Sequence, residues 1–217
     1  DMESCSNSGA ITHRNSTAQE VACVRPSVGG VAGCVGYSMK NCKNTGLVEF
    51  SGYSKHGSLE NFAGGCIRPA FGGVVGSIGS SADITGSVLQ NCNNSGELKV
   101  INHMVPSSED ADRIEPMMGG VAGYARVGVT YYDNETSGTI TDSSSGYYNG
   151  VGGIVGRVWG NNTMINCSNA AALSVSTFGN GDNQAMNAIF GGVAGRVEKA
   201  TNQCDNSGNI SFANNGN

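Results

Sequence analysis

The chain has 217 residues, which is enough for one domain with a sizeable core or for one run of repeats. Only 13% of its residues are charged and 34 are glycine, a composition that disfavours long surface helices and suits short strands joined by tight turns. The net charge of −5 argues against a nucleic-acid partner, and no apolar stretch approaches the about 20 residues of a membrane-spanning helix.

One glycine-rich block recurs five times along the chain, and we call it the Gly-Gly block. It consists of an apolar residue, Gly-Gly, two apolar residues and a further glycine. The copies begin at Val28, Phe71, Met118, Val151 and Phe190. Because side chains alternate between the faces of a strand, we expect Val31 and Val74 to face inward, whereas Val28, Phe71, Met118 and Phe190 face outward.

A second block, Cys-x-Asn-x-Gly-x-apolar, alternates with the first. Its copies begin at Cys5, Cys42, Cys92 and Cys204, with a copy at Cys167 that lacks the glycine. A degenerate copy without cysteine spans residues 133–140. Asn and Gly tolerate positive φ, so this block predicts a turn followed by another inward-facing strand.

The two blocks together predict a stack of equivalent coils. Such a unit cannot bury its apolar face alone and needs neighbours, which is the logic of a solenoid. We therefore expect residues 1–217 to form a single all-β domain, a parallel β-helix of about five coils. The spacing between Gly-Gly pairs runs 43, 47, 33 and 39 residues, so loops of different length should project from the coils. Because the chain opens inside a repeat, we expect it to be a fragment of a longer protein.

The combination of Gly-Gly-apolar-x-Gly with Asn-Cys-x-Asn-x-Gly resembles the GLUG-type repeats of large bacterial surface proteins, including adhesins. The resemblance covers nearly the whole chain. It implies a right-handed parallel β-helix and an extracellular or cell-surface setting. It carries over no catalytic residue, so an enzyme is not expected.

Five of the eight cysteines belong to the second block and should stack as a ladder. Stacked strands lie about 4.8 Å apart, within the Cα range that a disulfide allows. Two disulfides between neighbouring coils are predicted on this ground, Cys23–Cys66 and Cys5–Cys42. The alternative is that the cysteines are buried thiols used as small apolar side chains.

The three histidines, His13, His56 and His103, each lie sixteen residues before a Gly-Gly pair. They should therefore stack on successive coils. A histidine ladder is a candidate for metal binding or pH sensing. The alternative is one solvent-facing position inherited through duplication, and no resident metal or cofactor is expected.

Aromatic residues gather in the second half of the chain. They are Tyr124, Tyr131, Tyr132, Tyr147, Tyr148 and Trp159. Flat rings with a polar edge stack on sugar faces, so this set is a candidate glycan-binding patch. The alternative is that these tyrosines cover the degenerate repeat near Asp133.

The leading functional hypothesis is a structural or adhesive repeat domain outside the cell, which displays variable loops on a rigid solenoid. Its partners would be glycans or cell-surface proteins of a host. One alternative is a self-assembling filament or stalk subunit that pairs through open solenoid ends or through the apolar outward positions. Another is a carbohydrate-binding or polysaccharide-cleaving β-helix, although no Asp or Glu pair recurs between repeats.

Overall fold

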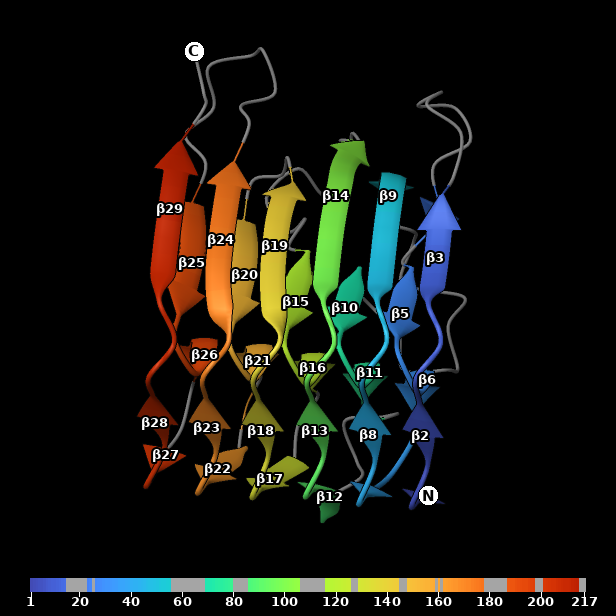
Figure 1. Cartoon of the computed structure of the whole chain (residues 1–217), viewed down its shortest axis with the longest axis vertical. Coiled ribbons are helices and arrows are strands. Elements are labelled where there is room, and N and C mark those ends of the chain that lie inside the picture. Colours follow the sequence, from blue (N-terminus) through green and yellow to red (C-terminus); the bar gives the residue numbers. More distant parts are fainter. Residues whose placement is uncertain are drawn as a thin grey trace.

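The computed structural model describes residues 1–14, 23–24, 26–55, 69–79, 86–105, 116–125, 129–144, 148–158, 160, 162–177, 187–197 and 201–214 (Figure 1). These residues form strands and no helix, and every strand pairs in parallel with a strand of a neighbouring coil, which is its equivalent in all cases except β4. The predicted parallel β-helix is confirmed. We call one coil a rung.

Each rung contributes one strand to each of five sheets, which run the length of the stack. Sheet 1 contains β1 (Met2–Glu3), β7 (Met39–Lys40), β12 (Ser87–Gln90), β17 (Val129–Tyr132), β22 (Thr163–Ile165) and β27 (Thr201–Asn202). Sheet 2 contains β2 (Ser6–Asn7), β8 (Lys43–Asn44), β13 (Asn93–Asn94), β18 (Glu135–Thr136), β23 (Ser168–Asn169) and β28 (Asp205–Asn206).

Sheet 3 has the longest strands. It contains β3 (Ile11–Arg14), β9 (Val48–Lys55), β14 (Leu98–Val105), β19 (Thr139–Ser144), β24 (Ala172–Thr177) and β29 (Ile210–Asn214), and β4 (Cys23–Val24) also pairs with β9. Sheet 4 contains β5 (Ser27–Gly29), β10 (Ala70–Gly72), β15 (Met117–Gly119), β20 (Tyr148–Gly152) and β25 (Asn187–Gly191). Sheet 5 contains β6 (Ala32–Val35), β11 (Val75–Ile78), β16 (Ala122–Ala125), β21 (Val155–Val158) and β26 (Ala194–Val197).

The described strands thus make five full rungs and the first three strands of a sixth. Rung 1 runs from β1 to β6, rung 2 from β7 to β11, rung 3 from β12 to β16, rung 4 from β17 to β21 and rung 5 from β22 to β26. Figure 1 shows the rungs in chain order, with β3 and β29 at opposite ends of sheet 3.

Equivalent valines of the Gly-Gly block lie over one another, as predicted. Val31 N–H donates to the carbonyl of Val74 at 2.9 Å, and Val74 N–H donates to that of Val121 at 3.0 Å. Val121 donates in the same way to Ile154, at 2.9 Å. Val74, Val121 and Ile154 have no exposed surface. Translational stacking therefore positions both the backbone and the apolar interior.

The interior of the described rungs is divided into two apolar cores, and a small third cluster of Ala70, Met117 and Tyr124 lies apart from them. The larger core lies between sheets 1, 2 and 5 and contains Val74, Val121 and the buried cysteines. The smaller core lies between sheets 3 and 4 and contains Phe50, Phe71 and their equivalents. Phe71 and Met118 are buried in this second core, so their prediction as outward positions is wrong. Alternation fails because the chain bends between the strand of sheet 4 and that of sheet 5.

A narrow waist of glycine and asparagine separates the two cores. The second glycine of the Gly-Gly block packs against the asparagine that follows it in the next rung. A Cβ atom on Gly30 would overlap the side chain of Asn44, and one on Gly73 would overlap that of Asn94. The pair of glycines is thus needed for close approach across the rung.

The asparagines of the second block form a hydrogen-bonded ladder through this waist. Asn7 Nδ2 donates to Asn44 Oδ1 at 2.8 Å, and Asn44 Nδ2 donates to Asn94 Oδ1 at 2.9 Å. Asn169 donates to Asn206 in the same way, at 2.7 Å. Thr136 interrupts the ladder in rung 4, and its Oγ1 atom is buried without a hydrogen-bond partner.

A second turn position also recurs, between sheets 1 and 2. One non-glycine residue per rung has positive φ there. These residues are Ser4, Asn41, Asn91, Asp133, Asn166 and Gln203, with φ of 55°, 54°, 48°, 51°, 53° and 53°. Asn is one of the few residues that tolerates this region, which explains the Asn-Cys sequence of three copies.

The waist predicts that Gly73→Ala destabilises the fold strongly. The new methyl group would overlap Asn94 and the backbone of Gly120, and overpacking of this kind costs about 3 kcal/mol. Gly9→Ala is the matched control, because its Cβ would meet only Asn7 Oδ1, at 3.7 Å. Urea unfolding followed by circular dichroism measures both. Equal stability of the two variants would contradict a close-packed waist.

The ladder predicts that Thr136→Asn stabilises the fold. The new amide would connect Asn94 to Asn169 and remove a buried hydroxyl without a partner, a gain of about 1 kcal/mol. For a chain of this size the thermal midpoint should rise by about 2–4 °C. Asn94→Thr is the reverse change and should lower the midpoint. A fall in the midpoint of Thr136→Asn would count against a continuous ladder.

Candidate functional site

The predicted tyrosine patch is not assembled in the described residues. Tyr124 is buried with Ala70 and Met117, and Tyr131 is fully buried in the larger core. Burial raises the pKa of Tyr131 well above its usual value. Tyr132 is 40% exposed. Tyr147, Trp159 and the side chain of Tyr148 lie outside the described residues. A sugar could therefore reach Tyr132 but neither Tyr124 nor Tyr131.

The predicted histidine ladder is wrong in its register. His13 pairs with Phe50, and the two rings stack with centroids 5.3 Å apart. His103 pairs instead with Tyr53, at a centroid distance of 5.1 Å. His56 lies outside the described residues. The connections that precede the Gly-Gly pairs differ in length, so counting back from those pairs does not give the register of sheet 3.

The cysteines of the second block do stack, as a ladder of thiols. In each rung that has this cysteine, its Sγ atom donates to the carbonyl two residues earlier, as Cys5 does to Glu3 at 3.4 Å and Cys42 to Lys40 at 3.2 Å. Cys5 and Cys42 are free thiols, so the disulfide predicted between them is not formed. For the other predicted disulfide, Cys66 and the side chain of Cys23 lie outside the described residues.

Burial suppresses the acidity of the inner thiols. It raises the pKa of the Cys92 thiol to about 12 and that of Cys167 to about 11. Because the thiolate is both the nucleophile and the metal ligand, these cysteines are chemically inert packing residues at neutral pH. Asn134 takes the place of cysteine in rung 4, where its Oδ1 atom accepts the N–H of Cys92 at 2.9 Å.

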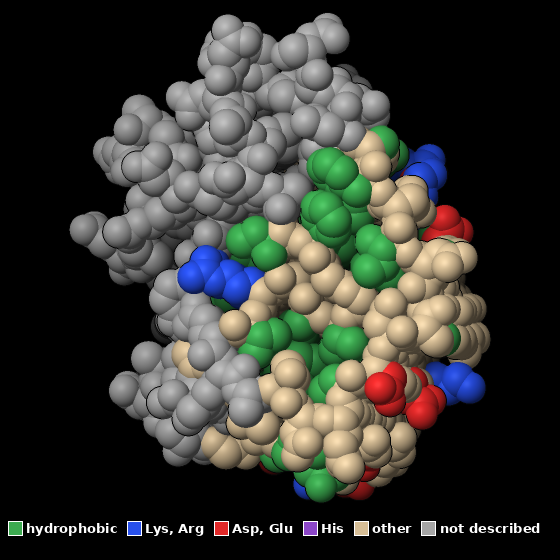
Figure 2. Space-filling view, turned by 90° about the vertical axis from the view of Figure 1, so that its left-hand side faces the viewer, with side chains coloured by type: hydrophobic (Ala, Val, Ile, Leu, Met, Phe, Trp, Pro, Cys, Tyr) green, Lys and Arg blue, Asp and Glu red, His purple; other side chains and the backbone are tan. Residues whose placement is uncertain are grey.

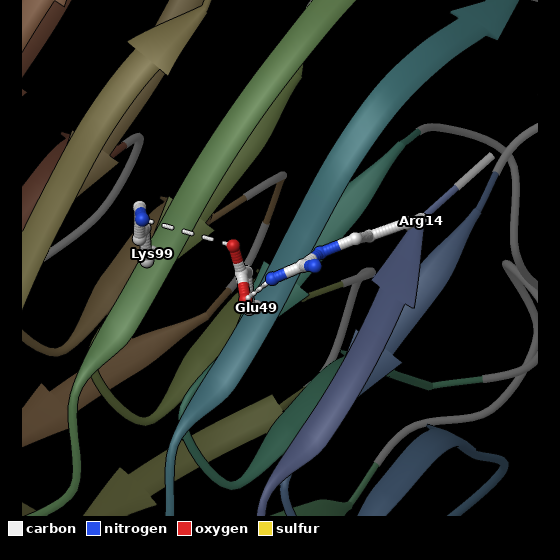
Figure 3. A network of polar contacts seen from close by, with 3 residues as sticks. All are labelled: Arg14, Glu49 and Lys99. Carbon is white, nitrogen blue, oxygen red and sulfur yellow. Dashed lines mark hydrogen bonds and ion pairs between the residues drawn. The ribbon is translucent and has the colours of Figure 1, made fainter. Parts of the chain in front are cut away.

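The outer face of sheet 3 carries an ion-pair network across three rungs (Figure 3). Glu49 of β9 lies between Arg14 of β3 and Lys99 of β14, with Oε2 3.1 Å from Arg14 Nη2 and Oε1 3.7 Å from Lys99 Nζ. The Glu49 side chain is only 9% exposed. Pairs with exposed lysine or arginine contribute less than about 1 kcal/mol, so the network aligns neighbouring strands more than it stabilises them.

The two ends of the described stack expose apolar side chains that inner rungs bury. Figure 2 faces the C-terminal end and shows hydrophobic side chains on its surface. Phe212 is 44% exposed at this end and stacks on Phe190 with ring centroids 4.8 Å apart, and Ile210 lies in the same strand, β29. At the other end, Ile11 is exposed at the position that Val48 and Leu98 bury in the inner rungs. The strand edges at both ends are open for pairing with further backbone.

Neither a cluster of metal-ligand residues nor a membrane-spanning helix occurs in the part of the chain described here. No group of three or more His, Cys, Asp or Glu residues in it could hold a metal ion. It also contains no helix of the length and apolarity that crossing a membrane requires.

Comparisons with known proteins identify no relative of the chain. No family, no curated protein and no solved structure matches it.

The thiol ladder predicts graded reactivity along the stack. Under native conditions iodoacetamide should label Cys92 and Cys167 more than about tenfold more slowly than the half-buried Cys5 and Cys204, because only accessible thiolate reacts. Peptide mass spectrometry measures each site, and unfolding in urea should equalise them. Equal native rates would contradict a buried ladder.

The same labelling experiment also reports on pairing of the ends, because Cys5 and Cys204 lie in the first and last rungs. A fall in the labelling rates of Cys5 and Cys204 with rising protein concentration would show that the ends pair.

Proposed function

We propose that the chain is an extracellular structural or adhesive repeat domain, in which the solenoid holds variable loops in fixed positions. The observation that carries this proposal is the uniform stacking of five sheets together with connections of unequal length. Loops that vary on a rigid scaffold are where binding usually resides.

The connections that would carry the function leave one corner of every rung. Each joins the end of a sheet 3 strand to the start of a sheet 4 strand. They run from residue 14 to 27, 55 to 70, 105 to 117, 144 to 148 and 177 to 187. Because neighbouring strands of sheets 3 and 4 pair in register, these connections leave the stack in a row along one corner, although β9 and β14 extend further than β3 and β19 before their connections begin.

The scaffold suits a load-bearing or spacing role for a physical reason. Hydrogen bonds between rungs run parallel to the long dimension of the sheets, and both apolar cores continue through every inner rung. A local change in one loop therefore leaves the contacts of the other rungs in place. The partners that we propose for the loop row are glycans or cell-surface proteins.

The ends of the stack favour a second candidate, a self-assembling filament or stalk. Phe212, Phe190 and Ile11 lie at the exposed ends, and their equivalents in inner rungs are buried. Burial of such side chains against a second copy would be favourable. Phe71 and Met118 give no support to side-by-side assembly, because they lie in the smaller core. The concentration dependence of Cys5 and Cys204 labelling separates end-to-end pairing from a solitary domain.

Loop replacement tests the display proposal. The chain itself offers a short connection, residues 145–147, and the pairing register makes residues 53–67 and 103–114 the equivalent segments that it can replace. We expect each variant to unfold within about 1 kcal/mol of the parent, because neither core is touched. We also expect the parent to bind glycans on an array or intact cells, and at least one of these variants to lose that binding.

Two controls make the test specific to the loop row. Thr141→Ala and Ser174→Ala change the outer face of sheet 3 and should leave binding intact. Failure of the parent to bind any glycan or cell surface, or retention of binding by both loop variants, would contradict adhesive display by this corner.

A further inference from the structure

One inward position of sheet 3 breaks the apolar pattern of the smaller core. The residues in register at this position are His13, Phe50, Val100, Asp142, Val175 and Phe212. Asp142 is 2% exposed, and its neighbours Val100 and Val175 are buried apolar residues of the adjacent rungs. A carboxyl group thus occupies a site that rungs 2, 3, 5 and 6 fill with valine or phenylalanine, whereas rung 1 fills it with His13, whose ring stacks on Phe50 at the end of the stack.

A short chain of hydrogen bonds connects this carboxyl group to rung 3. The Ser144 hydroxyl donates to Asp142 Oδ1, and the backbone N–H of Asn102 donates to Ser144 Oγ at 3.3 Å. Asn102 and Ser144 are themselves buried. The side chain of Ser144 therefore takes a position where a backbone carbonyl would otherwise accept the Asn102 N–H group.

The backbone pairing of sheet 3 is interrupted at the same place. β14 pairs with β9 along its whole length, from Leu98 to Val105, and β19 pairs with β24 from Thr139 to Ser144. Between β14 and β19, however, pairing covers only residues 98–100 and 140–142. We call this boundary the β14–β19 seam. It ends at Asp142.

Rung 4 also interrupts two other ladders. Thr136 replaces the ladder asparagine and Asn134 replaces the ladder cysteine. Rung 4, which carries Asp142, therefore departs from the repeated interior pattern at three positions.

No charged side chain among the described residues near Asp142 offsets the free-energy cost of burying its carboxylate. The ionisable residues of β14, Lys99 and His103, alternate to the outer face, where Lys99 pairs with Glu49 and His103 contacts Tyr53. The inward residues of β14 and β24 beside it, Val100 and Val175, carry no charge, and no ion pair of Asp142 occurs among the described residues. On the facing strands of sheet 4, the described inward residues Phe71, Met118 and Val151 are also uncharged.

Burial raises the pKa of Asp142 from 3.8 to about 7, and the Ser144 hydrogen bond opposes this only in part. The closed seam therefore keeps the proton up to neutral pH, whereas an open, hydrated seam loses it near pH 4. The stability of the closed seam is full below pH 4, falls as the pH rises toward 7 and is constant above it.

We propose that the β14–β19 seam is a pH-sensitive opening of the solenoid, closed while the Asp142 carboxyl group is protonated and opened locally when it ionises. Ionisation places a charge inside the smaller core, and hydration of that charge requires separation of the two strands where their pairing is already incomplete. The two halves of the stack, rungs 1–3 and rungs 4–6, would then be coupled more tightly in acid than at neutral pH.

Hydrogen–deuterium exchange of the full chain tests this inference, with Asp142→Asn as the matched variant that cannot ionise. We expect the ratio of wild-type to variant exchange in peptides covering 98–105 and 139–144 to rise between pH 5 and 7, by up to about tenfold per unit. Above pH 7 the ratio should level off. Taking the ratio at each pH removes the intrinsic pH dependence of amide exchange.

Two comparisons confine the effect to the seam. β9 and β24 lie one rung further from the seam than β14 and β19. In peptides that cover residues 48–50 of β9 or 172–174 of β24, the ratio of wild-type to variant exchange should rise less. A ratio that does not change with pH, or one that rises equally in all peptides, would overturn the proposal.

Asp142→Val supplies a second variant with the residue that flanks it in rungs 3 and 5, in case the asparagine variant does not fold. The ¹³C resonance of the Asp142 carboxyl group in the wild-type chain provides a measurement that needs no stable variant. A titration midpoint near pH 7 would support the proposal, and a midpoint near pH 4 would overturn it.

Discussion

The whole fold depends on one constraint, the in-register hydrogen bonding of each backbone segment to its equivalent in the next rung. Two chain segments must also approach closely across every rung, and glycine in the Gly-Gly block makes this possible against asparagine in the second block. The waist that results divides the interior, so one rung builds two cores rather than one. Stacking then continues each core through the molecule, because a buried residue of one rung packs against the equivalent residues of the rungs on either side.

The same constraint explains why departures from the pattern matter. A polar group inside a stack is stable when its equivalents form a ladder, as the asparagines do. Thr136, Asn134 and Asp142 break three different ladders, and all three lie in rung 4. The interruption of backbone pairing between β14 and β19 lies at the same boundary. Three departures from the repeated pattern and one incomplete strand pairing therefore meet in rung 4.

Sequence patterns predict the stacking direction well and the arrangement across a rung poorly. Recurrence of the Gly-Gly block is sufficient to place Val31 over Val74, because both share a position in a duplicated unit. It could not place Phe71, since the bend after the strand resets the alternation of side chains. The contact of Gly73 with Asn94 joins segments that no local pattern connects.

The sequence predicted the positions of the candidate site residues poorly, for similar reasons. His13 and His103 belong to different registers because connections of unequal length precede the Gly-Gly pairs. Tyr131 is buried because it occupies the position of Met39 and Leu89 in sheet 1. The sequence identifies Asp142 as an inward-facing residue only if Ile140 is aligned with Leu98, because this alignment places Asp142 over Val100.

The most direct test of the account is a methyl NOESY spectrum of the chain with labelled valine and isoleucine methyl groups. Stacking predicts cross-peaks that link Val74 to Val121 and Val121 to Ile154, since these residues are hydrogen-bonded neighbours in successive rungs about 4.8 Å apart. Absence of these cross-peaks in a folded sample, or their replacement by contacts between unrelated positions, would contradict translational stacking and everything that follows from it.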